Sequence, residues 1–217
     1  MALLLQKPWI KPYNGQAPTH LNWHRYTPQA TTTTGNIKPR VCIYVNKTIS
    51  THQILSIPSD NNLLNCITIN DFHPIIQRLT LLSVYNTPTS FDGLPHLQKW
   101  LNNLVNRNTP TLIMIDSNLH HCLWNPPQYK HSHPESRQLL KMCGKKGFKL
   151  ISPKHIQTFF GTTGRPTTID LTWANHVAQS LNQNQKPFLR PSTHNHEDIP
   201  IRPHSKTPIN YSKKTRP

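Results

Sequence analysis

The stretch TLIMIDSNLHHCLWN, residues 111–125, decides the fold. A short apolar run over residues 112–115 ends on Asp116, and Asn118 follows two positions later. Such a run favours a strand with both faces buried, and residues two apart on an extended chain point to the same side. The stretch therefore predicts a buried strand that places an acid and an amide at its carboxyl end. Without further motifs, Asp and Asn at a strand end are more often turn residues.

Other apolar runs rich in β-branched residues predict further strands. They are LLLQ (3–6), VCIYV (41–45), CITI (66–69), LTLLSVY (79–85), KLIS (149–152) and TTIDLTW (167–173). Helices are predicted over 91–106, where leucines recur at helical spacing, and over 134–147, where a proline lies near the start. Polar stretches at 31–34 and 180–187 predict loops. Strands with only a few helices favour an α/β or α+β layered fold.

The chain is strongly basic. Its 217 residues include 24 Lys and Arg against 8 Asp and Glu, a formal net charge of +16. This length suits one domain, predicted over residues 1–203, followed by a basic, disordered tail over 204–217. A surface of this charge attracts polyanions, of which nucleic acid is the commonest. Charge alone leaves open a basic protein that binds nothing specific.

Cysteine spacing and the amino-terminal sequence bear on the cellular location. The four cysteines lie far apart and form no CxxC pair, which argues against a zinc site and favours reduced thiols. The opening MALLLQKPWI has too short an apolar run for a signal sequence or a membrane span. We therefore expect a soluble, intracellular protein without membrane contact. The oligomeric state stays open, with a monomer favoured.

Five motifs follow one another along the chain: LLLQKPW near the start, LLSVYN, IDSNLHHCLWN, TTIDLTWAN and THNHEDIPI. This ordered series resembles the endonuclease/exonuclease/phosphatase family, specifically the apurinic-endonuclease-like domain of non-LTR retrotransposons. In that family the motifs look like QEP, VYNPP, GDFNLHHPLW, a strand ending IDLT, and SDH. The resemblance spans residues 3–201 and implies two mixed β-sheets packed face to face as a sandwich with flanking helices. It also implies Mg²⁺-dependent hydrolysis of a phosphodiester, which nicks DNA so that the element's RNA can be copied.

The resemblance also assigns catalytic roles. Asp116 and Asn118 match the aspartate and asparagine of GDFN, which orient water and phosphate. His196 matches the histidine that contacts the phosphate and takes part in proton transfer. Asp170 matches the aspartate that orients this ring and favours its charged form. Asp170 is expected in the middle of an apolar strand, where a carboxylate is costly without a partner.

Tyr85 and Asn86 match VYN, whose hydroxyl and amide would donate hydrogen bonds to the phosphate. The alternative for Tyr85 is an aromatic side chain that covers the core at a strand end. Trp124 and Trp173 are expected to pack in the core, in preference to stacking on a nucleobase.

The sequence departs from the family at its metal-binding positions. Lys7 stands where the family has its metal-binding glutamate, and an ammonium has no lone pair to give and repels a cation. Asn195 replaces the aspartate before the histidine, keeping its shape without its charge. Of the three expected metal-binding positions, Lys7, Asp116 and Asn195, only Asp116 would then offer a carboxylate to the implied Mg²⁺. The family's first strand would precede Met1 and is expected to be missing.

Three alternatives remain. An active nuclease would need another acid, such as Asp116 or Asp170, to hold the metal. A catalytically dead relic of a retrotransposon would keep the fold and bind nucleic acid through phosphates, with strong salt dependence. A reading frame without selected function would give a poorly folding product. Loss of a metal ligand favours the last two. A functional protein is expected in the nucleus with DNA as its partner.

Overall fold

The computed structural model describes residues 1–11, 15–29, 37–74, 76–104, 106, 108–160 and 166–184. The strands are β1 (Ala2–Gln6), β2 (Trp23–Tyr26), β3 (Val41–Asn46), β4 (Ile54–Ile57), β5 (Leu64–Asn70), β6 (Arg78–Tyr85), β7 (Thr111–Asp116), β8 (Phe148–Leu150) and β9 (Asp170–Asn175). The helices are η1 (Thr51–Gln53), α2 (Gly93–Asn102), α3 (Pro134–Lys145) and α4 (His176–Asn184). None of the helices in these ranges is long and apolar enough to cross a membrane.

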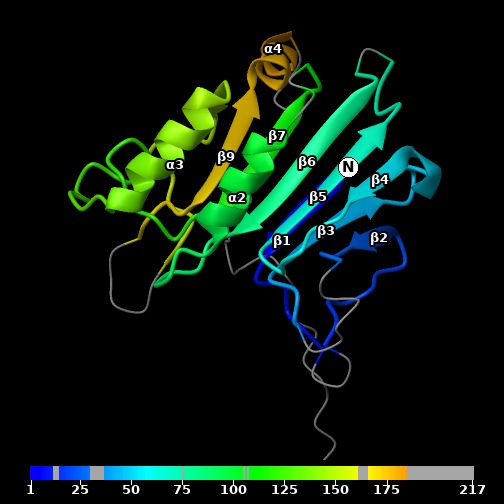
Figure 1. The fold of residues 1–217 in the computed structure, drawn as a ribbon, viewed down its shortest axis with the longest axis horizontal. Coiled ribbons are helices and arrows are strands. Elements are labelled where there is room, and N and C mark those ends of the chain that lie inside the picture. Colours follow the sequence, from blue (N-terminus) through cyan, green and yellow to red (C-terminus); the bar gives the residue numbers. More distant parts are fainter. Residues whose placement is uncertain are drawn as a thin grey trace, which may run out of the picture.

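Two sheets form the body of the molecule (Figure 1). The larger sheet has six strands in the order β4-β5-β6-β7-β9-β8. It is mixed, since β6 and β7 run parallel while the neighbouring pairs are antiparallel. The smaller sheet has three strands in the order β1-β3-β2 and is antiparallel.

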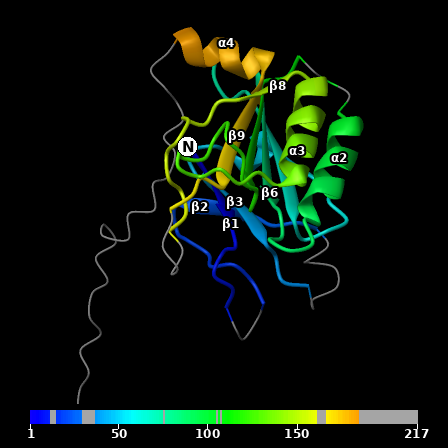
Figure 2. The same cartoon turned by 90° about the vertical axis from the view of Figure 1, so that its left-hand side faces the viewer.

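The two faces of the larger sheet bury different partners because side chains alternate along each strand. On one face, Ile67 and Ile69 of β5 and Leu81 of β6 pack against Ile43 and Val45 of the smaller sheet. The other face packs beneath α2 and α3, which lie side by side over it (Figure 2). The predicted sandwich of two sheets with flanking helices is confirmed.

The predicted elements are found with shifted ends, and some were missed. Strand β9 begins at Asp170, three residues later than predicted, because Thr167 pairs only with Phe159 in an isolated bridge. Strands β2 and β4 were not predicted. Helix α2 ends at Asn102, earlier than the predicted limit.

The predicted loop over 180–187 is wrong for residues 180–184, which belong to α4. The Asn175 side-chain oxygen accepts a hydrogen bond from the Ala178 amide, 3.0 Å away, and so caps the start of the helix. Leu181 packs against the core between the sheets. The predicted loop at 31–34 and the predicted tail over 204–217 lie outside the described residues.

Gly93 begins α2 directly against the end of β6. A Cβ atom there would lie 2.5 Å from the Tyr85 carbonyl oxygen and 2.8 Å from the Asn86 Cα, both of them backbone atoms. We expect Gly93→Ala to lower the free energy of unfolding by about 1–3 kcal/mol, measured by urea denaturation. The control is Gly144→Ala in α3, where no atom lies within 4 Å, so stability is kept or raised. Equal stability of the two variants would contradict this close packing.

Candidate active site

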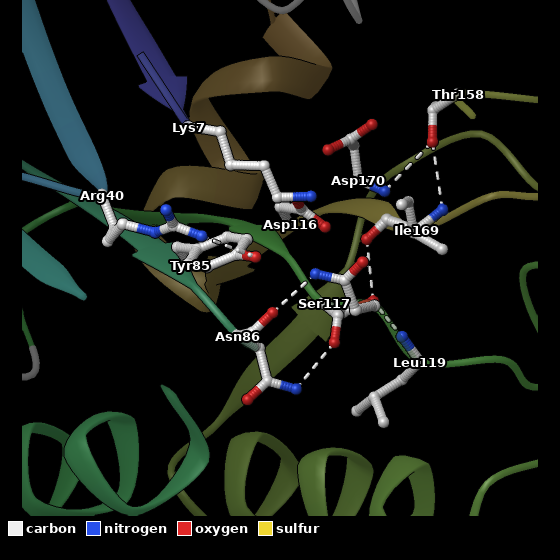
Figure 3. A network of polar contacts seen from close by, with 11 residues as sticks. Lys7, Arg40, Tyr85, Asn86, Asp116, Ser117, Leu119, Thr158, Ile169 and Asp170 are labelled. Carbon is white, nitrogen blue, oxygen red and sulfur yellow. Dashed lines mark hydrogen bonds and ion pairs between the residues drawn. The ribbon is translucent and has the colours of Figure 1, made fainter. Parts of the chain in front are cut away.

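Polar residues gather at one end of the sandwich, where β6 and β7 end and β9 begins (Figure 3). Asp116 is the last residue of β7, and its Cα pairs with that of Asp170, the first residue of β9. On the other side of β7, Tyr85 is the Cα partner of Asp116 in the parallel pairing with β6. The strand register therefore brings three of the residues predicted from sequence together.

Strand β1 carries Lys7 to the same place. The Gln6 side-chain amide donates hydrogen bonds to Ser83 Oγ at 3.0 Å and to the Met114 carbonyl oxygen at 3.4 Å, which holds β1 across β6 and β7. Lys7 then adopts a positive φ of 49°, uncommon outside glycine. Its Nζ lies 3.4 Å from Asp116 Oδ2. Lys7 thus forms an ion pair with the acid of the IDSN motif.

Asp116 is a carboxylate in an unfavourable place. Its side chain is 8% exposed, and Oδ1 has no hydrogen-bond partner among the described residues. Burial and then the nearby charge of Asp170 raise the pKa of Asp116 to about 6, although Lys7 acts in the opposite direction. The carboxylate therefore depends on a nearby cation, and Lys7 supplies it.

The described residues do not fit a magnesium ion. Mg²⁺ requires oxygen ligands in near-octahedral geometry, whereas the ammonium of Lys7 lies against Asp116 Oδ2 and has no electron pair to donate. In the described part of the chain, no group of three or more His, Cys, Asp or Glu side chains is arranged to hold a metal. The site as folded carries its own cation.

Tyr85 lies between two cations. The Lys7 Nζ is 5.0 Å from the centre of the Tyr85 ring and the Arg40 Cζ is 4.8 Å from it. Arg40 also donates a hydrogen bond from Nη2 to the Tyr85 hydroxyl at 3.3 Å. The Tyr85 residue is 1% exposed, so its ring is a fixed support for both side chains. Sequence reasoning missed Arg40, which belongs to no motif and immediately precedes β3.

The amides of the site hold the strand ends together. Asn86 Nδ2 donates to the Ser117 carbonyl oxygen at 2.7 Å, and Asn118 Nδ2 donates to the Asn86 carbonyl oxygen at 2.6 Å. Asn118 has a positive φ of 48°, which asparagine tolerates better than most residues. Asn86 is fully buried, so its amide acts here as a positioning group. The phosphate contacts expected of Asn86 and Asn118 stay predictions.

Two hydroxyl groups anchor the site to the segment before β9. Ser117 Oγ donates to the Ile169 carbonyl oxygen at 2.7 Å. Thr158 Oγ1 accepts from the backbone amides of Ile169 and Asp170, each at 3.0 Å. These residues fix the start of β9 beside the end of β7. Neither hydroxyl was predicted, because single Ser and Thr residues carry no recognisable spacing.

The remaining predicted residues divide into two groups. His196 and Asn195 lie outside the described residues, so their roles stay predictions, as does the orientation of His196 by Asp170. Trp124 and Trp173 are 0% and 2% exposed, and Trp124 Nε1 donates to the Leu119 carbonyl oxygen at 3.0 Å. The prediction that both tryptophans pack in the core is confirmed.

A two-sheet sandwich with acids and amides at the ends of its central strands defines a domain of the endonuclease/exonuclease/phosphatase type. The chain belongs to the endonuclease-reverse transcriptase family, whose sequence profile matches residues 79–198. No curated protein sequence matches the chain significantly.

A solved structure of a retrotransposon endonuclease domain shows the same fold. The endonuclease domain of TRAS1, a telomere-specific non-LTR retrotransposon, is 18% identical with a TM-score of 0.60, covering 83% of this chain and 75% of that domain. An AP endonuclease from Archaeoglobus fulgidus is more distant, at 15% identity and a TM-score of 0.47 over 71% and 67% of the two chains. The resemblance to retrotransposon endonuclease domains seen in the motifs is therefore confirmed at the level of family and fold.

Proposed function

We propose that this chain is a retrotransposon-type endonuclease domain in which Mg²⁺-dependent nicking of DNA is impaired and binding to DNA is retained. The carrying observation is the ammonium of Lys7, 3.4 Å from Asp116 Oδ2. In phosphodiester hydrolysis a divalent cation polarises the phosphoryl group and neutralises developing charge. A univalent ammonium on the carboxylate that should hold that cation opposes its binding. A domain with this function acts in the nucleus, where chromosomal DNA is found.

Retained DNA binding is supported by charge and by family. The formal net charge of +16 favours contact with a polyanion, and the family to which the chain belongs consists of nucleases. Binding of this kind neutralises phosphates and is strongly weakened by salt. It does not require the metal chemistry that the site has lost.

Conversion of a supercoiled plasmid to the nicked form tests the impairment. We expect the parent chain to nick no faster than Asp116→Ala, with or without Mg²⁺. Lys7→Glu, alone or with Asn195→Asp, is expected to nick roughly 100-fold faster in Mg²⁺, because a Lewis acid supplies several kcal/mol of transition-state stabilisation. The rate should fall to the parent level in EDTA.

Two results would contradict the proposal in different ways. Nicking by the parent chain that both EDTA and Asp116→Ala abolish would mean a live nuclease with a rearranged metal site. Silence of the folded Lys7→Glu and double variants in Mg²⁺ would mean that Lys7 is not the cause of the impairment.

A further inference from the structure

Two cations, Lys7 and Arg40, lie together against the Tyr85 ring at the site. The backbone amide of Lys7 donates to the carbonyl oxygen of Arg40 at 2.8 Å, which joins the two residues directly. Both side chains then lie against the ring of Tyr85, at 5.0 Å for Lys7 Nζ and 4.8 Å for Arg40 Cζ. Cation–π contacts of this kind are attractive. The side chains are therefore arranged in advance and would lose little conformational freedom on meeting an anion.

The cations also remain reachable from solvent. The Lys7 side chain is 45% exposed although its ammonium touches Asp116, and Arg40 is exposed. An ammonium has three donor hydrogens and a guanidinium has five. The contacts to Asp116 and to the Tyr85 hydroxyl use one donor from each group. Figure 3 shows Lys7 and Arg40 converging on Tyr85 from β1 and from the residue before β3.

We propose that Lys7 and Arg40 form a metal-free binding site for a phosphodiester group of nucleic acid. The Lys7 ammonium, tied to Asp116, provides the positive charge at the place where the family binds a divalent cation, and the Arg40 guanidinium donates to a phosphate oxygen. A guanidinium suits phosphate because its planar donors match two oxygens. This site deepens the proposed function, since it assumes that the domain binds nucleic acid.

Metal independence follows from the same geometry. In a site that uses Mg²⁺, the ion links protein carboxylates to the phosphate, so chelation removes binding. Here the positive charge that contacts the phosphate is the Lys7 ammonium, which is a covalent part of the chain and is already paired with Asp116. Mg²⁺ would act on this site only by screening charge, as any salt of equal ionic strength does.

Fluorescence anisotropy with a labelled single-stranded oligonucleotide tests the site in the full chain. We expect equal affinity in EDTA and in Mg²⁺ at matched ionic strength. Lys7→Met and Arg40→Gln should each weaken binding about 10-fold, an ordinary loss for one charge-assisted hydrogen bond. Each should also lower the slope of log affinity against log salt by about 0.7. Unlabelled oligonucleotide should displace the labelled strand far better than inorganic phosphate does. If inorganic phosphate competes equally well, the site binds free phosphate instead of nucleic acid.

The matched control is Lys141→Met, which removes the same charge from an exposed position on α3. Circular dichroism and thermal melts establish that each variant is folded. If Arg40→Gln does not fold, Arg40→Lys replaces it in the binding measurements. If the parent binds but Lys7→Met and Arg40→Gln behave like Lys141→Met, the site is overturned while nucleic-acid binding stands. If EDTA abolishes binding, a metal is needed and the site is likewise overturned. If the folded parent binds no oligonucleotide, the proposed function fails with it.

Discussion

Replacing Lys7 with glutamate is expected to make the stability of the domain depend on divalent cations. The parent pairs the Lys7 ammonium with Asp116 at 3.4 Å, beside Asp170. Lys7→Glu would place three carboxylates there, and like charges at close range repel. At pH 8 in EDTA we expect a loss of about 2–4 kcal/mol, somewhat below the usual cost of breaking a buried pair, because the Lys7 side chain is 45% exposed.

Magnesium should restore that loss in the variant alone. A ligand that binds only the folded state adds about 2.7 kcal/mol when present at 100 times its dissociation constant. Melting temperatures in EDTA, in MgCl₂ and in NaCl of equal ionic strength measure the effect. The control is Lys7→Met, which removes the ion pair without adding a carboxylate and should not respond to Mg²⁺ specifically. A parent chain whose melting temperature rises as much as the variant's would mean that the ammonium does not exclude the ion.

The sequence predicted the sheets well because their strands are apolar runs with polar ends. Buried strands such as β6 and β7 have few polar side chains along their length, so the pattern marks both the strand and the residue at which it ends. Tyr85 and Asp116 each lie at such an end, and pairing of the strands brings them together. The prediction that Asp170 lies in the middle of a strand is wrong, because β9 begins at Asp170, where it pairs with Asp116. A local pattern therefore predicted a large part of the site.

The remaining parts depend on contacts between distant segments. The Arg40 carbonyl oxygen accepts from the Lys7 amide, a contact just beyond the paired ends of β1 and β3 that no motif encodes. Thr158 lies in a loop and acts through backbone amides of Ile169 and Asp170. Lys7, which forms the ion pair with Asp116, also has a positive φ, a backbone conformation that a lysine does not predict.

Removing the charge of Asp116 is expected to stabilise the domain at neutral and alkaline pH. Burial and Asp170 raise the pKa of Asp116 from 3.8 to about 6 in the folded chain. The folded state therefore binds the Asp116 proton more tightly than the unfolded state does. The contribution of protonated Asp116 to stability is full below pH 3.8 and is lost as pH rises through about 6. Asp116→Asn resembles the protonated acid at every pH. At pH 8 the variant should be more stable by on the order of 3 kcal/mol, from about 1.36 kcal/mol for each pKa unit.

Urea denaturation of parent and variant between pH 4 and pH 8, followed by tryptophan fluorescence, measures this difference. Because every other ionisable group is the same in both chains, the contributions of those groups largely cancel when the two curves are subtracted. The remaining difference should grow to its full value as pH rises from 3.8 to about 6. Asp60→Asn is the matched control. Asp60 pairs with Lys99 at 2.6 Å on the surface, and hydrogen bonding to Lys99 lowers the pKa of Asp60 to about 2. Loss of the Asp60 charge should therefore slightly lower the free energy of unfolding at pH 8, as for other exposed ion pairs. A parent as stable as Asp116→Asn at pH 8 would show that the Lys7 ammonium fully compensates the burial of the carboxylate.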